Sequence, residues 1–309
     1  MKPKWIDTIG LVIISFSLLM ASGYKRPGST SAQFLKIGVS ARAVGLGEAY
    51  TAVAQGADAF FYNPAALALV PSVDLFASHS SWFAGLNFQS LAVAKNFNRL
   101  GTMCVSFTGL QSDEMKVRTP LKPDGTGETF YVGNYRMGLS FAKFLTNHAA
   151  LGIGLNYLYL KMWDYSVYSF SADLGVMFLT NYHGFRFGMS IVNFGPEIKF
   201  LKEQYAIPTN FSFGAAIEPI HRGPHVLTVS FTTIKVTDAE QKLRMGGEYA
   251  FNRTFFLRAG YKFELDEESW SAGFGVKMKI ASLHLRFDYA YSDFGLIGNR
   301  NLLTLGLTF

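Results

Sequence analysis

The chain has 309 residues, of which 49% are hydrophobic, 16% aromatic and 16% charged, a more apolar balance than most soluble proteins of this size have. Its single cysteine, Cys104, excludes a disulfide framework and argues against a cysteine-based zinc site. The net charge is +6, but the basic residues are scattered singly and form no run, which argues against binding to nucleic acid.

The first residues are typical of an export signal. Lys2 and Lys4 make a basic start, residues 9–20 form an uninterrupted run of apolar and small residues, and Ala21-Ser22-Gly23 offers small residues to a signal peptidase. We therefore expect a signal peptide over residues 1–23, removed as the chain leaves the cytoplasm. The alternative, an N-terminal membrane anchor, needs about 20 apolar residues, which this run does not supply.

The next segment, residues 24–71, is rich in alanine and glycine. Ser40 is a predicted cap for a short helix that Gly45 and Gly47 interrupt, while Asn63 and Pro64 predict a second helix over Pro64–Leu69. Small residues let backbones approach closely, so we expect this segment to form a plug in a confined lumen, on its periplasmic side. We expect its Arg42 to pair with an inward acid, the candidates being Asp173, Glu248 and Asp288.

From residue 72 onward the chain alternates apolar and polar residues with a period of two, as strands with one apolar face do. Leu283, Leu285 and Phe287, for example, alternate with His284, Arg286 and Asp288. The pattern predicts about fourteen strands: Val73–His79, Leu86–Lys95, Thr102–Leu110, Phe130–Leu145, Ala149–Met162, Ser166–Leu179, Phe185–Phe194, Pro208–Glu218, Pro224–Ile234, Leu243–Phe251, Thr254–Phe263, Trp270–Ile280, Leu283–Tyr291 and Asn301–Phe309.

The connections between these strands alternate between tight turns and longer loops, which is typical of a transmembrane antiparallel β-barrel in the bacterial outer membrane. The fold class we expect is therefore all-β, with a barrel over residues 72–309 and a short helical N-terminal plug in its lumen. A secreted β-sandwich or propeller is the alternative, but its polar faces should be richer in Asp, Lys and Thr. The last strand ends as an outer-membrane assembly signal does, with the residues Leu303, Leu305, Leu307 and Phe309 on one face.

Charged residues in the polar phase of the strands are the candidate working surface, because this phase faces the lumen of a barrel. They are Arg136, Asp173, Arg186, Arg244, Glu248, Arg258, Lys262, Lys277, Lys279, Arg286 and Asp288. One interpretation is that they pair with one another and with the plug, since an unpaired buried charge is costly. The other is that their surplus positive charge attracts an anionic ligand, such as a carboxylate head group or an acidic cargo segment.

No catalytic residue, metal site or cofactor is predicted. The six histidines are dispersed, and the one close pair, His221 and His225, lacks further ligands at a recognisable spacing. His79 has no serine or aspartate at a motif spacing. We therefore expect a protein that is not an enzyme.

Three stretches of the N-terminal segment carry a family resemblance: Gly38–Tyr50, Ala54–Phe61 and Tyr62–Ala68. Together they resemble the N-terminal signature of the PorV/PorQ family of outer-membrane barrels, which are similar to FadL-type transporters. The carboxyl end agrees, through Phe287–Gly295 and the closing Phe309. The chain departs from the family pattern at Leu46, at Gln55-Gly56 and at Ala66, where the family commonly has Met, an acidic pair and Gly.

The resemblance implies two different functions. The first is that of an accessory or receptor protein of the type IX secretion system, which accepts cargo proteins through their C-terminal signal domains and passes them to other secretion components. The second is that of a FadL-like transporter, which passes hydrophobic small molecules across the outer membrane past a luminal hatch. In either case outer-membrane lipid surrounds the barrel. Of the two, the sequence favours the secretion function narrowly, although the outer loops are modest for docking cargo.

Overall fold

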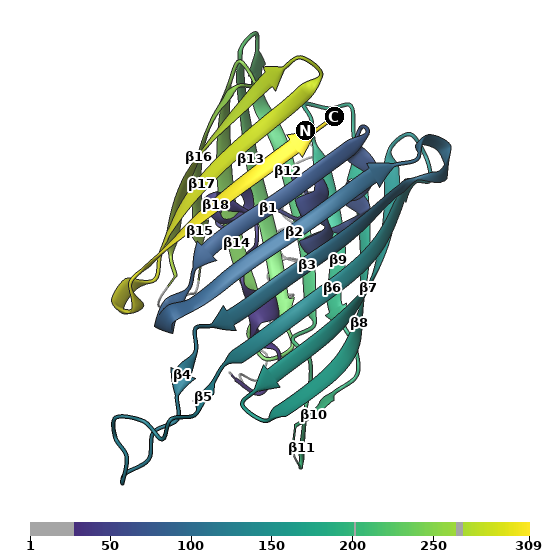
Figure 1. The fold of residues 1–309 in the computed structure, drawn as a ribbon. Helices are drawn as coiled ribbons and strands as arrows, with labels where there is room; N and C mark the ends of the chain where they lie inside the picture. Colours follow the sequence, from purple (N-terminus) through teal and green to yellow (C-terminus); the bar gives the residue numbers. More distant parts are fainter. Residues whose placement is uncertain (1–27, 201, 264–267) are drawn as a thin grey trace, which may run out of the picture.

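Fourteen strands form a closed antiparallel barrel in the computed structural model, which describes residues 28–200, 202–263 and 268–309. Each strand pairs with its neighbours along the chain, and the last strand pairs with the first to close the wall (Figure 1). The predicted signal peptide lies outside the described residues. The barrel strands are Val73–Ser81 (β1), Leu86–Asn96 (β2), Thr102–Ser112 (β3), Val132–Phe144 (β6), Ala149–Met162 (β7), Tyr165–Leu179 (β8), Arg186–Phe194 (β9), Asn210–Arg222 (β12), His225–Val236 (β13), Lys242–Phe251 (β14), Phe255–Lys262 (β15), Trp270–Ile280 (β16), Leu283–Asp293 (β17) and Asn299–Thr308 (β18).

The predicted fold class is confirmed, because the alternation in the sequence becomes the two faces of the wall. In β7 the exposed residues Ile153, Leu155 and Tyr157 alternate with Gly154, Asn156 and Leu158, which are buried. The same alternation gives most strands a band of exposed large apolar side chains on the outside and small or polar side chains inside. An apolar outer surface around a polar interior is what a membrane-spanning barrel requires.

Several predicted strand boundaries are wrong for local reasons. Phe130 does not begin a barrel strand; it belongs to β5 (Thr129–Phe130), which pairs with β4 (Met115–Lys116) in a small hairpin outside the wall. A second hairpin, β10 (Ile198–Phe200) with β11 (Glu203–Tyr205), was not predicted. The strands predicted to start at Pro208 and Pro224 start later, since proline has no N–H for the strand ladder.

The barrel has two different ends. At the short-turn end, tight connections such as Thr146-Asn147 and Asn252-Arg253 join the strands, and Phe309 closes the chain (Figure 1). At the long-loop end lie the longer connections that carry β4–β5 and β10–β11, which project from the bottom of the barrel in Figure 1. This is the predicted alternation of turns and loops.

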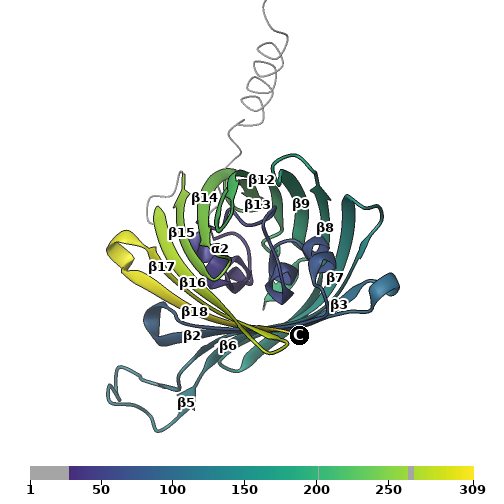
Figure 2. The same cartoon turned by 90° about the horizontal axis from the view of Figure 1, so that it is seen from above.

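Four short helices precede the wall: η1 (Gln33–Lys36), α2 (Ala41–Gly45), η2 (Ala57–Phe61) and η3 (Pro64–Leu69). Seen along the barrel, the N-terminal segment that carries them lies inside the ring of strands (Figure 2). The remaining helices, η4 (Phe83–Gly85), η5 (Asn98–Leu100) and η6 (Gly295–Ile297), lie in connections between strands. Among the described residues, no helix is long and apolar enough to cross a membrane.

The plug runs through the whole lumen, which we expected it to fill or close. Ser31 donates a backbone hydrogen bond to Ala206 in the loop after β11, at the long-loop end. At the other end, Asn96 donates a hydrogen bond to the carbonyl of Val70, just before β1. The plug therefore enters at the long-loop end and leaves at the short-turn end.

Candidate functional site

Glycines seat the plug against the inner wall. A Cβ at Gly260 of β15 would lie 1.9 Å from the amide nitrogen of Gly47, and one at Gly45 would lie 3.2 Å from the Cα of Gly273 in β16. Gly47 itself has a φ of +62°, a conformation that a side chain disfavours. Backbone therefore packs directly on backbone here, as the density of small residues in the plug predicts.

The two predicted helix caps differ. Asn63 caps η3 as expected: its side-chain oxygen accepts a hydrogen bond from the amide of Ala65 at 3.1 Å, and Pro64 occupies the first turn. Ser40 precedes α2, but its side chain makes no capping hydrogen bond. Ser40 therefore marks the start of the helix by its extended backbone alone.

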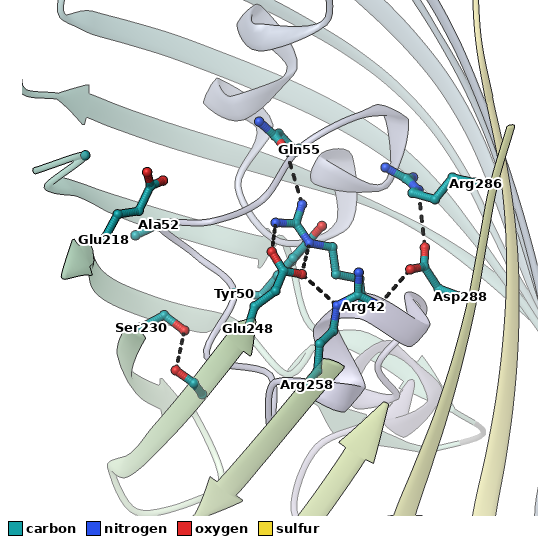
Figure 3. Close-up of polar contacts among 12 residues, drawn as sticks. Arg42, Tyr50, Ala52, Gln55, Glu218, Ser230, Glu248, Arg258, Arg286 and Asp288 are labelled. Atoms are coloured by element: carbon teal, nitrogen blue, oxygen red, sulfur yellow. Dashed lines mark hydrogen bonds and ion pairs between the residues drawn. The ribbon is translucent and has the colours of Figure 1, made fainter. Parts of the chain in front are cut away.

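Arg42 begins a chain of buried charges that joins the plug to the wall (Figure 3). Its guanidinium binds both carboxylate oxygens of Glu248 at 2.8 and 2.7 Å, so the structure selects Glu248 from the three candidate acids. Arg258 bridges Glu248 and Asp288, each at 2.6 Å. Arg286 then lies 3.3 Å from Asp288 and 3.6 Å from Asp58 of the plug. Cations and acids thus alternate along the chain.

A second cluster joins the plug to β14 and β15 nearer the long-loop end. Glu48 of the plug forms ion pairs with Arg244 and with Lys262, the latter at 3.2 Å, and Lys262 also pairs with Glu268. Arg300, which was not among the predicted residues, donates a hydrogen bond to the carbonyl of Gly38 at 2.6 Å. The wall residues of this cluster are cations, and the plug supplies the acid Glu48. An acidic residue within the plug sequence was therefore the signal that could have identified this contact.

Arg136 and Asp173 pair with each other at 2.7 Å on the opposite side of the lumen. Asn156 binds both of them, and the Arg136 guanidinium lies 5.0 Å from the ring centroid of Phe60 in the plug. Asp173 also accepts a hydrogen bond from the amide of Asn193, at 2.7 Å. Asn193 has a φ of +61° at the point where the pairing of β8 with β9 shifts register. The pair therefore supports a bulge in the wall.

Arg186 contacts the plug near the short-turn end. It donates a hydrogen bond to the carbonyl of Ala52 at 3.1 Å and forms an ion pair with Glu218 at 2.8 Å. Every predicted luminal residue named so far has a partner in the wall or the plug. By contrast Lys277 and Lys279 are exposed near the end of β16 and form no ion pair with a described residue. The paired arrangement favours the structural interpretation of the luminal charges over attraction of an anionic ligand.

A separate set of polar contacts holds residues 30–36 at the long-loop end. Asp238, in the loop between β13 and β14, accepts hydrogen bonds from Thr30 at 2.7 Å, Gln33 at 3.2 Å and Lys36 at 2.6 Å. Burial alone would raise the pKa of the Asp238 carboxyl, but the bonds from Lys36, Thr30 and Gln33 outweigh it and lower that pKa below its ordinary value. The carboxylate form is therefore the one that fastens this segment.

Two cavities lie at the long-loop half of the lumen. The outer cavity has a volume of about 830 Å³, and its surface is largely apolar, through side chains such as Leu110, Leu160 and Phe200, although Lys161, Lys202 and Glu203 also line it. The inner cavity, about 390 Å³, is more polar and includes Arg136, Arg244 and Arg300 in its wall. Gln33 and Phe34 line both cavities, so η1 separates them.

A model of the uncharacterised protein family UPF0164 matches residues 13–309, nearly the whole chain. The chain belongs to this family. No curated protein sequence matches the UPF0164 chain. Its similarity to known proteins is therefore found in solved structures.

The barrel of this UPF0164 member is similar to several solved structures. A FadL homologue of Pseudomonas aeruginosa has a TM-score of 0.55 and 11% identity, with 88% of this chain and 98% of that one covered. The Pseudomonas putida toluene transporter TodX has a TM-score of 0.58 and 10% identity, covering 92% and 97%. The monoaromatic hydrocarbon channel CymD has a TM-score of 0.58 and 11% identity, covering 88% and 98%. At these identities the likeness concerns the fold.

The remaining predicted residues of the UPF0164 chain lie on its outer surface. Leu303, Leu305 and Phe309 are exposed on β18 and at the end of the chain, while Leu307 is half-buried. Their role in assembly stays a prediction. Within residues 28–200, 202–263 and 268–309, no group of three His, Cys, Asp or Glu side chains could hold a metal ion.

Proposed function

We propose that this protein passes hydrophobic small molecules across the bacterial outer membrane. The observation that carries the proposal is the outer cavity, which is apolar, large enough for a small molecule and placed at the mouth of a barrel whose outer surface is apolar. The names of the structural neighbours support it, since they include a toluene transporter and a monoaromatic hydrocarbon channel. The predicted signal peptide supports the export that this location needs.

The plug defines the route that a molecule would take. Beyond the outer cavity, η1 blocks the way to the inner cavity with Phe34, which is 3% exposed. Beyond the inner cavity, the plug is fastened to the wall by ion pairs and glycine contacts. A molecule would therefore bind first in the outer cavity and proceed only when residues 30–36 move.

A substitution that fills the outer cavity tests this function. Leu160 of β7 faces the cavity and is 6% exposed, whereas its neighbour Tyr159 lies in the outward phase of the same strand. We expect Leu160→Trp to reduce toluene uptake into vesicles at least tenfold, because the larger ring occupies the space that the hydrocarbon needs. Tyr159→Trp is the matched control and should leave uptake unchanged. Equal uptake by both variants and the wild type would contradict the proposal.

The type IX secretion function is a second candidate, supported by the resemblance of the N-terminal segment to the PorV/PorQ family. One structural feature favours it: the β4–β5 hairpin projects beyond the barrel at the long-loop end, where a cargo protein could dock (Figure 1). Affinity capture from detergent-solubilised outer membrane tests it. Recovery of secretion components or of proteins with a C-terminal signal domain would support it, and recovery of bound lipid or hydrocarbon alone would favour transport.

A further inference from the structure

The short-turn end of the barrel carries a ring of exposed cations. Each turn at this end, except the one between β8 and β9, has at least one exposed lysine or arginine in it or beside it. None of these side chains forms an ion pair with a described residue. The ring, which we call the basic rim, consists of Lys95, Arg99, Lys143, Arg222, Arg253 and Lys279.

Acids do not balance this ring. Within the described part of the chain, the turns at the short-turn end contain no exposed aspartate or glutamate. Glu218 lies close by, but it is half-buried and already engaged by Arg186 and His221. The long-loop end is different: in the β3–β6 connection the exposed acids Asp113, Glu114, Asp124 and Glu128 accompany Lys116, Arg118 and Lys122. The unbalanced positive charge is therefore concentrated at one end.

Apolar side chains stand among the cations of the basic rim. Leu100 is 72% exposed, Leu145 is 66% exposed, and the Lys95 ammonium lies 5.2 Å from the ring centroid of Phe97. Lysine and arginine beside exposed apolar side chains are suited to a membrane interface, because their stems cover hydrocarbon while their charges reach the head groups. A water-facing basic patch would not need these apolar neighbours.

We propose that the basic rim binds the anionic head groups of phospholipids in the leaflet that meets the short-turn end. The arrangement favours lipid over a protein partner, because the cations occupy turns between β2 and β3, β6 and β7, β12 and β13, β14 and β15, and β16 and β17, around most of the circumference. A folded partner covers one sector of a barrel, whereas lipid head groups surround it. Clusters of lysine and arginine at a membrane surface attract anionic lipid in this way.

The inference rests on the proposed membrane location but not on transport. It is tested with the full chain inserted into vesicles of phosphatidylcholine and phosphatidylglycerol, using spin-labelled analogues of each lipid to measure their relative association with the barrel. For the wild type we expect phosphatidylglycerol to associate several-fold more strongly, since each lysine or arginine near an anionic surface contributes about fivefold at low salt. Salt should weaken this preference.

Two triple variants separate the rim from general basicity. Replacing Arg99, Arg222 and Arg253 with Gln should bring phosphatidylglycerol close to phosphatidylcholine in its association. Replacing Lys116, Arg118 and Lys122 with Gln removes the same number of exposed cations from the long-loop end and should change nothing. All six side chains are exposed, so neither change disturbs the packed interior.

Four results would overturn the inference. Equal association of the two lipids with the wild type would do so, and so would an equal loss of preference in the two triple variants. Preference that disappears when inorganic phosphate replaces chloride at equal ionic strength would identify a free-phosphate site instead. A wild-type chain that does not enter the vesicles would contradict the membrane location and the lipid preference together, while normal insertion with failed hydrocarbon uptake would contradict transport alone.

Discussion

The two parts of the plug are held in the lumen by different means. Residues 38–70 are fixed by direct backbone packing at Gly45 and Gly47 and by buried ion pairs such as Arg42 with Glu248. Residues 28–36 bury Phe34 in the lumen, and their polar contacts with the loops converge on a single carboxylate, that of Asp238. The first set is spread over several ion pairs and backbone contacts inside the barrel, whereas the polar part of the second depends on one loop residue, Asp238. The difference indicates that residues 38–70 form a permanent stopper and that residues 28–36 form a movable segment.

The largest expected effect on stability comes from breaking the ion pairs that fix residues 38–70. Glu248→Gln leaves Arg42 and Arg258 without their shared acid in a buried site, which costs about 3–5 kcal/mol of unfolding free energy. Urea denaturation of the refolded barrel in detergent measures it. Glu218→Gln is the matched control, because its ion pair with Arg186 is partly exposed and should cost less than about 1 kcal/mol. Similar losses in the two variants would show that the chain of charges does not fix the plug.

A methyl group at the tightest backbone contact should have the next largest effect. Gly260→Ala places a Cβ 1.9 Å from the amide nitrogen of Gly47, and the backbone must shift to admit it, at a cost of about 1–3 kcal/mol. In contrast, a Cβ at Gly247 of β14 meets nothing within 4 Å. The Gly247→Ala barrel should therefore melt at the same temperature as the wild type, and the Gly260→Ala barrel at a lower temperature. If both variants melt together, the plug tolerates displacement from the wall.

Substitutions at the two predicted helix caps, Ser40 and Asn63, should change the unfolding free energy by smaller and different amounts. Asn63→Ala removes an acceptor for Ala65 and donors to the carbonyls of Thr51 and Val176, so we expect a loss of about 2 kcal/mol. Ser40→Ala removes a buried hydroxyl that makes no capping hydrogen bond and, among the described residues, interacts only with the Asp58 carboxyl, so we expect a smaller loss, below about 1 kcal/mol. The same denaturation experiment checks both. Equal losses in Ser40→Ala and Asn63→Ala would mean that the missing capping bond does not distinguish the two residues.

The sequence predicted the strands of the wall better than the path of the plug, because strands depend on a local pattern and the plug depends on contacts between residues far apart in the sequence. A strand with one lipid-facing side repeats every two residues, so the periodicity of Leu283–Asp293 locates β17 from local pattern alone. The direction of the plug depends instead on contacts between distant residues, such as Ser31 with Ala206. No local pattern encodes such a pairing.

The luminal charges fall between these cases. Their inward phase placed Arg258, Arg286 and Asp288 correctly in the lumen, but phase cannot decide partners among several acids and bases at similar depth. Asp58 was missed because it lies in the plug, where no strand period identifies it. The hairpins β4–β5 and β10–β11 were missed because strands of two or three residues are too short to show a period. The wall is a repeating pattern, and these features are not.

A small expected change in stability is also the sharpest test of the movable segment. Asp238→Asn weakens the bond to the half-exposed Lys36 ammonium, but the amide oxygen can still accept from Thr30 and Gln33, so the global unfolding free energy should fall by about 1 kcal/mol. Amide hydrogen exchange over residues 28–36 should nevertheless accelerate by at least tenfold, with exchange over residues 57–69 unchanged. Asp113→Asn, in an exposed loop, is the control.

Protonating the Asp238 carboxylate at low pH should loosen residues 28–36 of the wild type as Asp238→Asn does. The pKa of Asp238 is lower in the folded protein than in the unfolded chain, so its contribution is fully present above the unfolded value of about 4 and is lost as the pH falls through the folded value. Protection factors over residues 28–36, which correct for the intrinsic pH dependence of amide exchange, should therefore fall below about pH 4 in the wild type and change much less with pH in Asp238→Asn. Equal pH dependence in the two proteins would mean that another group fastens the segment. Residues 28–36 would then be as permanently fixed in the lumen as residues 38–70.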